Sequence, residues 1–101
     1  MQLLGIHHVA IICSNYTRSK HFYSEILKLK IINEHYRAER KSYKLDLALP
    51  DGSQLELFSF NDAPSRPSYP EAQGLRHLAF KVNSVENSKT YLKSHGIIKR
   101  K

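Results

Sequence analysis

The feature that most constrains the fold of this chain is a weak internal repeat with an offset of 69 residues. The apolar stretch at residues 5–13 has a weaker echo at residues 75–82, and the gapless alignment places His8 on His77 (77 − 8 = 69). In both copies, a run suited to a β-strand ends at Ser or Asn and is followed by a segment of helical periodicity. The repeat suggests two copies of one strand–helix unit.

A chain of 101 residues predicts one small domain, residues 1–101, with a modest hydrophobic core. Its 41% hydrophobic and 25% charged residues are ordinary for a globular protein. The single cysteine, Cys13, excludes an intramolecular disulfide framework and fits a reducing compartment. We see no secretory signal, and no apolar run reaches the roughly 18 residues of a membrane span. We therefore expect a cytoplasmic protein with no membrane partner.

The net charge of +7 is compatible with a nucleic acid, an anionic membrane or an acidic small molecule as partner. Apart from Arg40-Lys41 and residues 99–101, the basic residues are scattered singly along the chain. The sequence has no basic stripe interleaved with aromatic residues, the pattern typical of single-strand binding. This distribution argues against a nucleic-acid partner.

Local patterns predict a first unit of one strand, one helix and three further strands. Large apolar residues recur every three or four positions after Tyr16, which predicts a helix with one buried face. The Pro50-Asp51-Gly52 sequence predicts a tight turn, because proline presets φ and glycine tolerates positive φ. The expected elements are a strand at residues 5–13, a helix at 16–27, and strands at 29–36, 42–49 and 53–60.

Three prolines separate this unit from the next. Pro64, Pro67 and Pro70 prevent a continuous helix or a ladder strand around them. After them we expect a strand at residues 75–82 and a helix at 85–95. The predicted fold class is α+β. Its parts are a βαβββ module at residues 4–60, a linker at 61–73 and a partial βα module at 74–98.

The second module lacks counterparts for three strands of the first. By the same offset, Lys101 corresponds to position 32 (101 − 69 = 32), near the start of the first unit's second strand. We therefore expect a chain that is truncated at its C-terminus relative to two full modules.

Three ionisable residues lie on strand faces that are otherwise apolar. Successive side chains of a strand point to opposite faces, so His8, Glu56 and His77 each share a face with apolar residues. An ionisable group on such a face is costly to bury unless it is paired or binds a metal. Two imidazoles and a carboxylate suit Zn, Ni, Mn or Fe(II) and leave positions open for substrate oxygens.

Each of these residues also has an ordinary structural interpretation. A lone His in a strand is more often a hydrogen-bonded core or surface residue, and Glu56 could pair with a cross-strand Lys or Arg. His7 points to the opposite side of the strand by alternation and is interpreted as structural. The remaining histidines lie in polar stretches and are interpreted as surface residues: His21, His35 and His95.

Taken together, these motifs resemble the vicinal oxygen chelate superfamily. It contains glyoxalase I, fosfomycin-resistance thiol transferases, methylmalonyl-CoA epimerase, extradiol dioxygenases and bleomycin-resistance proteins. The resemblance rests on His8-Val9-Ala10-Ile11, on Asp51-Gly52 before Leu55-Glu56-Leu57, and on Gly74-Leu75-Arg76-His77-Leu78-Ala79-Phe80. It covers residues 4–98 and extends to small bacterial glyoxalase-like proteins that share the proline-rich linker. It implies two βαβββ modules that form a curved mixed sheet around a metal, with the helices on the outside of the sheet.

The resemblance also implies a role for each candidate residue. His8, Glu56 and His77 match the metal ligands of the first, fourth and fifth strands, in the order found in glyoxalase I. Glu56 is the only carboxylate of the chain placed to move a proton, so it is the candidate catalytic residue. A fourth ligand, a late Glu, would fall at about position 125 (56 + 69 = 125), beyond Lys101. We therefore expect metal binding, with full activity in question.

The implied function is that of a glyoxalase I-like, metal-dependent lyase or isomerase. Its substrate would be a small, oxygen-chelating and anionic molecule, such as a hemithioacetal thiol conjugate. The alternative is a catalytically inactive or truncated member that sequesters a small ligand, as bleomycin-resistance proteins do. Family members commonly pair two chains, so we expect a homodimer whose contact surface includes residues 75–82 and the second helix.

Overall fold

The computed structural model describes residues 1–97 and divides into two compact units, Met1–Ser65 and Arg66–Lys101. The boundary falls inside the linker expected at residues 61–73. Residue 98, the expected end of the second module, and the basic residues 99–101 lie outside the described residues.

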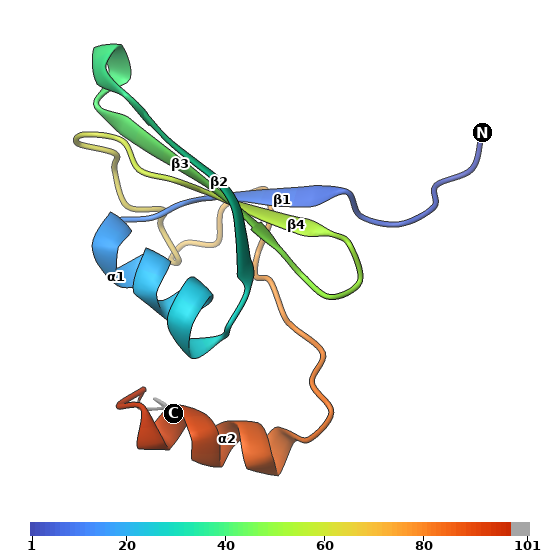
Figure 1. The fold of residues 1–101 in the computed structure, drawn as a ribbon. Coiled ribbons are helices and arrows are strands. Elements are labelled where there is room, and N and C mark those ends of the chain that lie inside the picture. The colour runs from blue at the N-terminus through green and yellow to red at the C-terminus, as the bar shows by residue number, and fades with distance from the viewer. Residues whose placement is uncertain (98–101) are drawn as a thin grey trace. The chain divides into compact units, whose positions relative to one another are not determined.

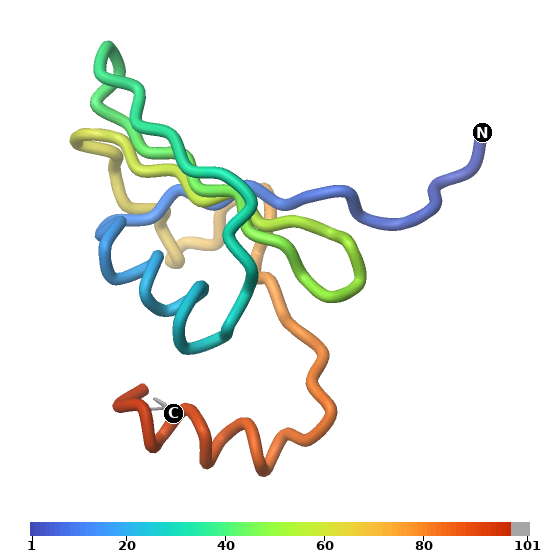
Figure 2. The backbone as a smooth tube through the Cα atoms, viewed as in Figure 1, coloured from blue at the N-terminus to red at the C-terminus, as the bar shows by residue number. Residues whose placement is uncertain are grey.

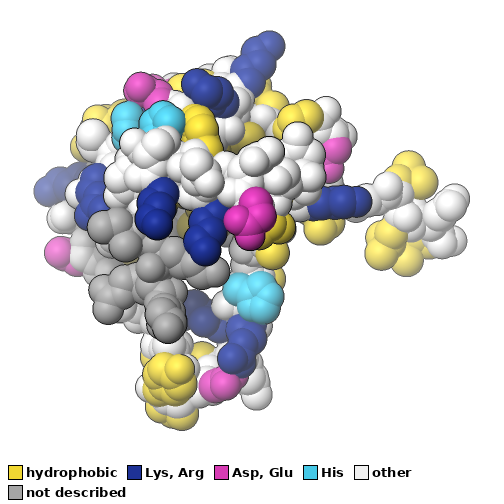
Figure 3. Space-filling model, turned by 90° about the horizontal axis from the view of Figure 1, so that it is seen from below, with side chains coloured by type: hydrophobic (Ala, Val, Ile, Leu, Met, Phe, Trp, Pro, Cys, Tyr) yellow, Lys and Arg dark blue, Asp and Glu magenta, His cyan; other side chains and the backbone are white. Residues whose placement is uncertain are grey.

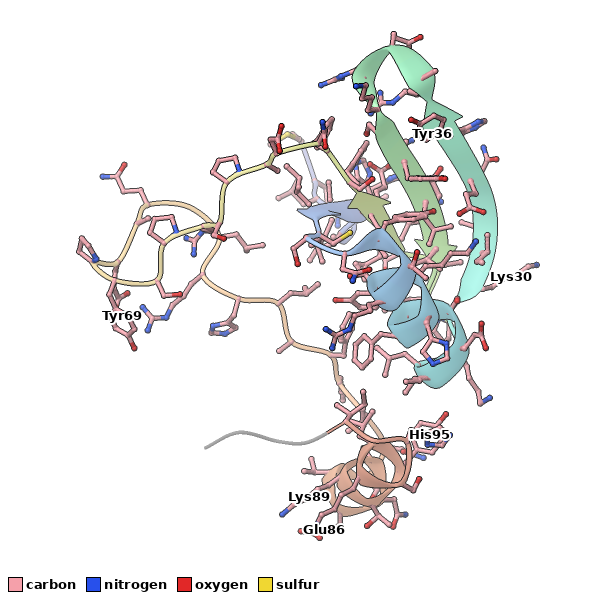
Figure 4. The ribbon with its side chains drawn as sticks, turned by 90° about the vertical axis from the view of Figure 1, so that its left-hand side faces the viewer. Lys30, Tyr36, Tyr69, Glu86, Lys89 and His95 are labelled. Carbon is pink, nitrogen blue, oxygen red and sulfur yellow. The ribbon has the colours of Figure 1, made fainter. Side chains whose placement is uncertain are left out.

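The first unit is built on a four-stranded sheet with the order β1-β4-β3-β2 (Figure 1). β1 pairs in parallel with β4, while β3 pairs antiparallel with both β4 and β2. The sheet is curved and open, and the expected strand, helix and three-strand order is confirmed. The strands are β1 (His8–Ile12), β2 (Lys30–Arg37), β3 (Ser42–Ala48) and β4 (Gln54–Phe58). Lys30 and Tyr36 lie toward the two ends of β2 (Figure 4).

The first helix is shorter than predicted and continues as a wider turn. α1 (Tyr16–His21) begins after Asn15, whose Oδ1 accepts a hydrogen bond from the Arg18 amide at 3.1 Å. It is followed by one π-helical turn, η1 (Phe22–Ile26), in which the Leu27 amide donates to the Phe22 carbonyl at 2.8 Å. The expectation of one continuous α-helix at residues 16–27 is therefore wrong. In η1 the backbone hydrogen bonds reach back five residues, and not the four residues of an α-helix.

The turn between β3 and β4 has the predicted chemistry. Gly52 has a φ of +91°, and its amide donates to the Leu49 carbonyl at 3.0 Å. Asp51 Oδ1 accepts hydrogen bonds from the amide and the hydroxyl of Ser53, at 3.0 and 2.6 Å. The turn fixes the register of the hairpin, so that Ala48 pairs with Gln54. A second, 3₁₀ turn, η2 (Ala38–Arg40), joins β2 to β3.

The two faces of the sheet differ in polarity. Four leucines point to the face that packs against Tyr16 and Tyr23 from α1 and η1, and their exposure is 0–1%. The opposite face carries the charged side chains of Lys44, Asp46 and Glu56 together with the ring of Phe58. Figure 2 shows the backbone of β1 entering the sheet from the extended N-terminal segment. The buried leucines are Leu45, Leu47, Leu55 and Leu57.

The second unit contains one helix and a long irregular segment. α2 (Val85–Ser94) begins after Ser84, whose hydroxyl accepts a hydrogen bond from the Asn87 amide at 3.1 Å. Figure 4 shows Tyr69 in the proline-rich segment, and Glu86, Lys89 and His95 on or beside α2. Within residues 1–97, no helix is long and apolar enough to cross a membrane.

The strand predicted at residues 75–82 is not formed. These residues have no regular secondary structure, and among the described residues none of them belongs to a strand ladder. A strand is stable only when its backbone groups pair with a neighbouring strand. Alternating apolar residues predict a surface that is able to pair, but they do not supply the partner.

Candidate functional site

The parallel pairing of β1 with β4 brings two of the three predicted metal ligands together. Ala10 is the register partner of Glu56, so His8 lies diagonally beside Glu56 on the same face of the sheet. His8 Nε2 lies 3.7 Å from Glu56 Oε2, and the side chains are 44% and 18% exposed. The pair is therefore open to solvent on the histidine side and half-buried on the carboxylate side.

The face that carries His8 is not the buried one. Ile12, which shares this face, is 59% exposed, whereas Ile11 on the other face packs against the leucine core. The expectation of a costly apolar environment for His8 is therefore wrong. Periodicity shows that residues 8, 10 and 12 share a face, but only packing against α1 decides which face is buried.

His7 contacts the candidate site, in contrast to the sequence-based expectation. Its Nδ1 lies 2.9 Å from His8 Nδ1, and the two rings meet edge to face with centroids 5.1 Å apart. One of these nitrogens must donate and the other accept, so the contact couples the tautomers of the two rings. When His8 Nδ1 donates, its Nε2, which lies 3.7 Å from Glu56 Oε2, carries the lone pair that can bind a metal. His7 precedes β1, so strict strand alternation does not apply to it.

Asp46 is a second carboxylate at the site that the sequence reading missed. It is the register partner of Glu56 in the antiparallel β3–β4 pair. Its side chain is 15% exposed, and its Oδ1 forms an ion pair with Lys44 Nζ at 3.5 Å. The same oxygen is buried and accepts no hydrogen bond from residues 1–97. Directly opposed carboxylates repel each other, and the Lys44 ammonium offsets that repulsion. Glu56 is therefore not the only carboxylate near the site.

The His8–Glu56 pair fits two positions of a metal site. Imidazole nitrogen and carboxylate oxygen bind zinc at about 2.1 Å, so two such ligands near the tetrahedral angle lie about 3.4 Å apart. The observed 3.7 Å is close to that separation. His77, the third predicted ligand, lies in the second unit, where it lines a 310 Å³ cavity with residues of the proline-rich segment. In the part of the chain that the structure describes, no group of three or more His, Cys, Asp or Glu gathers to hold a metal.

The sequence model of the Glyoxalase/Bleomycin resistance protein/Dioxygenase superfamily matches residues 5–100. This chain belongs to that superfamily. It is 54% identical over 97 residues to the uncharacterized protein YwkD of Bacillus subtilis (strain 168), a match that spans 96% of this chain and 76% of that protein.

Solved structures of the superfamily share the fold. A glyoxalase family protein from Enterococcus faecalis superposes with a TM-score of 0.86 at 48% identity, over 95% of this chain and 75% of that chain. The trypanothione-dependent glyoxalase I of Leishmania major superposes with a TM-score of 0.70 at 26% identity, over 91% of this chain and 66% of that chain. The family resemblance predicted from the motifs is therefore confirmed.

Proposed function

We propose that this protein is a metal-dependent isomerase or lyase of the glyoxalase I type, acting on a small anionic molecule with two adjacent oxygens. The observation that carries the proposal is the position of His8 and Glu56, which lie 3.7 Å apart on the open face of the sheet. Membership of the superfamily and the likeness to the Leishmania major glyoxalase I support the same chemistry.

In this proposal His8, Glu56 and His77 hold a divalent ion such as Zn, Ni, Mn or Fe. A divalent ion bound there supplies Lewis-acid polarisation of the substrate oxygens. The carboxylate oxygen of Glu56 that does not bind the metal would take the proton of the hydroxyl-bearing substrate carbon and return it to the adjacent carbonyl carbon. The hydroxyl proton would pass to the former carbonyl oxygen, so the isomerisation is balanced. His8 fixes the position of the substrate oxygens relative to that carboxylate.

The metal site is tested by metal analysis of purified protein. We expect wild type to hold a divalent ion and His8→Ala to lose most of it, because a strong ligand is removed. The chain offers a matched control in His21, whose Nδ1 also lies 3.7 Å from a carboxylate, Glu25 Oε2, on one helical segment. His21→Ala should keep the metal. Equal metal content in wild type and His8→Ala would overturn the site.

The reaction is tested by turnover of a hemithioacetal formed from an α-ketoaldehyde and a thiol. We expect metal-dependent turnover that falls by about 10²–10⁴-fold in Glu56→Gln when the two proteins are compared at equal bound metal, the range for loss of an acid–base group. Saturable binding of the same compound without turnover, in protein that holds its metal, would instead assign the chain to the ligand-binding members of the superfamily.

A further inference from the structure

Lys and Arg appear at separate places on the face shown in Figure 3. In the first unit, however, three cations gather around two stacked aromatic rings beside the His8–Glu56 pair. We call this group the cation–aromatic platform; it consists of Arg37, Arg40, Lys44, Phe58 and Phe60.

The platform has a defined geometry. The rings of Phe58 and Phe60 stack with centroids 6.0 Å apart and planes inclined by 9°. The guanidinium carbon of Arg37 lies 5.6 Å from the Phe58 centroid, and that of Arg40 lies 5.0 Å from the Phe60 centroid. Lys44 Nζ lies 6.0 Å from the Phe58 centroid. Contacts of this kind restrict the orientation of a guanidinium without neutralising its charge.

The two arginines of the platform lack a carboxylate partner. Within residues 1–97, Lys44 pairs with Asp46, but neither Arg37 nor Arg40 has an Asp or Glu oxygen within ion-pair distance. Arg37 Nε is buried without a hydrogen-bond partner, and Arg37 Nη2 donates only a long hydrogen bond, 3.5 Å, to Ser42 Oγ. Because Arg37 Nε is buried, the groups suited to bind a carboxylate or phosphate through paired hydrogen bonds are the outer nitrogens of Arg37 and the exposed guanidinium of Arg40.

The platform lies a short way along the sheet from Glu56. Phe58 follows Glu56 by two residues on the same face of β4, and Lys44 is its register partner in β3. Two residues of a strand span about 7 Å, and four span about 14 Å. An anion bound at the platform would therefore lie about 7–14 Å from Glu56.

We propose that Arg37, Arg40 and Lys44 bind the anionic end of the substrate, a carboxylate or phosphate that lies about 7–14 Å from its reacting oxygens. The proposal rests on the proposed function for the reacting end of the molecule, but the anion site itself does not require a metal. It selects an elongated substrate over a compact one in which the anionic group adjoins the reacting oxygens.

The anion site is tested by titrating metal-free protein with inorganic phosphate. The amide chemical shifts of Lys44 and Phe58 report the binding. We expect saturable shifts, with affinity reduced by about tenfold or more in Arg37→Ala and in Arg40→Ala. Arg18→Ala, which changes an arginine of α1, is the control and should bind like wild type. If Arg37→Ala does not fold, Arg37→Lys keeps the charge without the fork and should bind with intermediate affinity. Unchanged phosphate affinity in the platform variants would overturn the proposal.

The spacing is tested on metal-loaded protein with two dicarboxylates of different length, succinate and decanedioate. We expect decanedioate to bind at least tenfold more tightly than succinate, and Arg37→Ala to remove that preference while the metal content stays unchanged. Equal affinities for the two lengths would overturn the inferred separation. If wild type binds phosphate through Arg37 but retains no metal, the proposed function fails while the anion site stands.

Discussion

Glu34 on β2 joins the sheet to α1 through both oxygens of its carboxylate. Tyr16 Oη donates to Oε2 at 2.5 Å, and Lys20 Nζ donates to both oxygens at 2.9 Å. The Tyr16 hydroxyl, and then the Lys20 ammonium, hold the pKa of Glu34 below its usual value of 4.5. The Tyr16 ring also stacks on Tyr43, with centroids 4.3 Å apart. Glu34 is therefore part of a structural contact, and we expect it to contribute to stability.

Glu34→Gln should lower the free energy of unfolding at pH 7 by about 0.2–1 kcal/mol, the range for partly exposed ion pairs. Because the pKa of Glu34 is lowered by folding, its contribution is present above pH 4.5 and is lost as the pH falls through the folded-state pKa. Urea denaturation between pH 7 and pH 3 should therefore show a weaker pH dependence in Glu34→Gln than in wild type. Glu39→Gln, in the exposed η2 turn, is the control. Parallel pH profiles for wild type and Glu34→Gln would contradict this account.

His7 provides a second prediction at this scale, one that rests on the proposed metal site. Because its Nδ1 contacts His8 Nδ1 at 2.9 Å, His7→Ala should leave the His8 tautomer unfixed and weaken metal affinity by about 10–100-fold. Competition with a chelating dye measures this affinity directly. His35→Ala, on β2, should bind metal as wild type does. Equal affinities in wild type and His7→Ala would show that the histidine contact has no effect on the metal.

At the scale of the elements, Lys28 follows η1 and adopts the left-handed backbone conformation, with a φ of +60°. This conformation favours glycine. Lys28→Gly should raise stability by about 0.5–1 kcal/mol. Glycine removes a backbone strain of about 1–2 kcal/mol from the folded state. It also makes the unfolded chain more flexible, which lowers stability by about 0.4–1 kcal/mol, a smaller effect. Lys28→Ala keeps the Cβ atom and should gain nothing. A midpoint shift of equal size for the two variants in urea would mean that the lysine side chain, rather than backbone strain, is the cause.

Local patterns predicted the elements of the first unit well, because each element is set by short-range rules. The Pro50-Asp51-Gly52 turn placed the β3–β4 hairpin, and it also fixes the pairing of Asp46 with Glu56, since both lie five residues from Asp51. That symmetry was available in the sequence and would have identified Asp46. The π-helical turn and the contact of His7 with His8 were not predictable, because both depend on packing and on hydrogen bonds that no periodicity reports.

The second unit shows where the sequence was insufficient. Leu78, Phe80 and Val82 alternate as a strand would require, and the helix at residues 85–95 was predicted to within one residue of α2. A helix satisfies its own backbone, so its sequence pattern suffices to predict it. A strand depends on a partner, and the sequence of residues 75–82 does not contain that information. The relation of His77 to His8 and Glu56 therefore remains a prediction from the family resemblance.

At the scale of the whole molecule, the exposed apolar residues of the second unit predict self-association. Leu75, Phe80 and Val85 are 64%, 39% and 74% exposed, and large apolar side chains gain about 1.5–3 kcal/mol each when they are buried. Pairing with a second copy would bury them and give residues 75–82 the strand partner that they lack in the described chain.

We expect a dimer in sedimentation velocity at micromolar concentration, and a shift toward monomer in Phe80→Lys. Leu3→Lys introduces the same charge at an exposed leucine of the N-terminal segment and should leave the dimer intact. A wild type that sediments as a monomer would refute the prediction. Hydrogen exchange adds a second readout, because amides at residues 77–82 should be protected only in the dimer.

The parallel pairing of β1 with β4 has a consequence for how the protein is made. β1 is synthesised first, yet its partner is the last strand of the unit, and His8 and Glu56 are 48 residues apart (56 − 8 = 48). While β2, β3 and β4 pair with their immediate neighbours in the chain, β1 must wait until residue 58 has left the ribosome. Any ligand that requires both His8 and Glu56 therefore recognises only chains that have completed this slow, non-local step of folding.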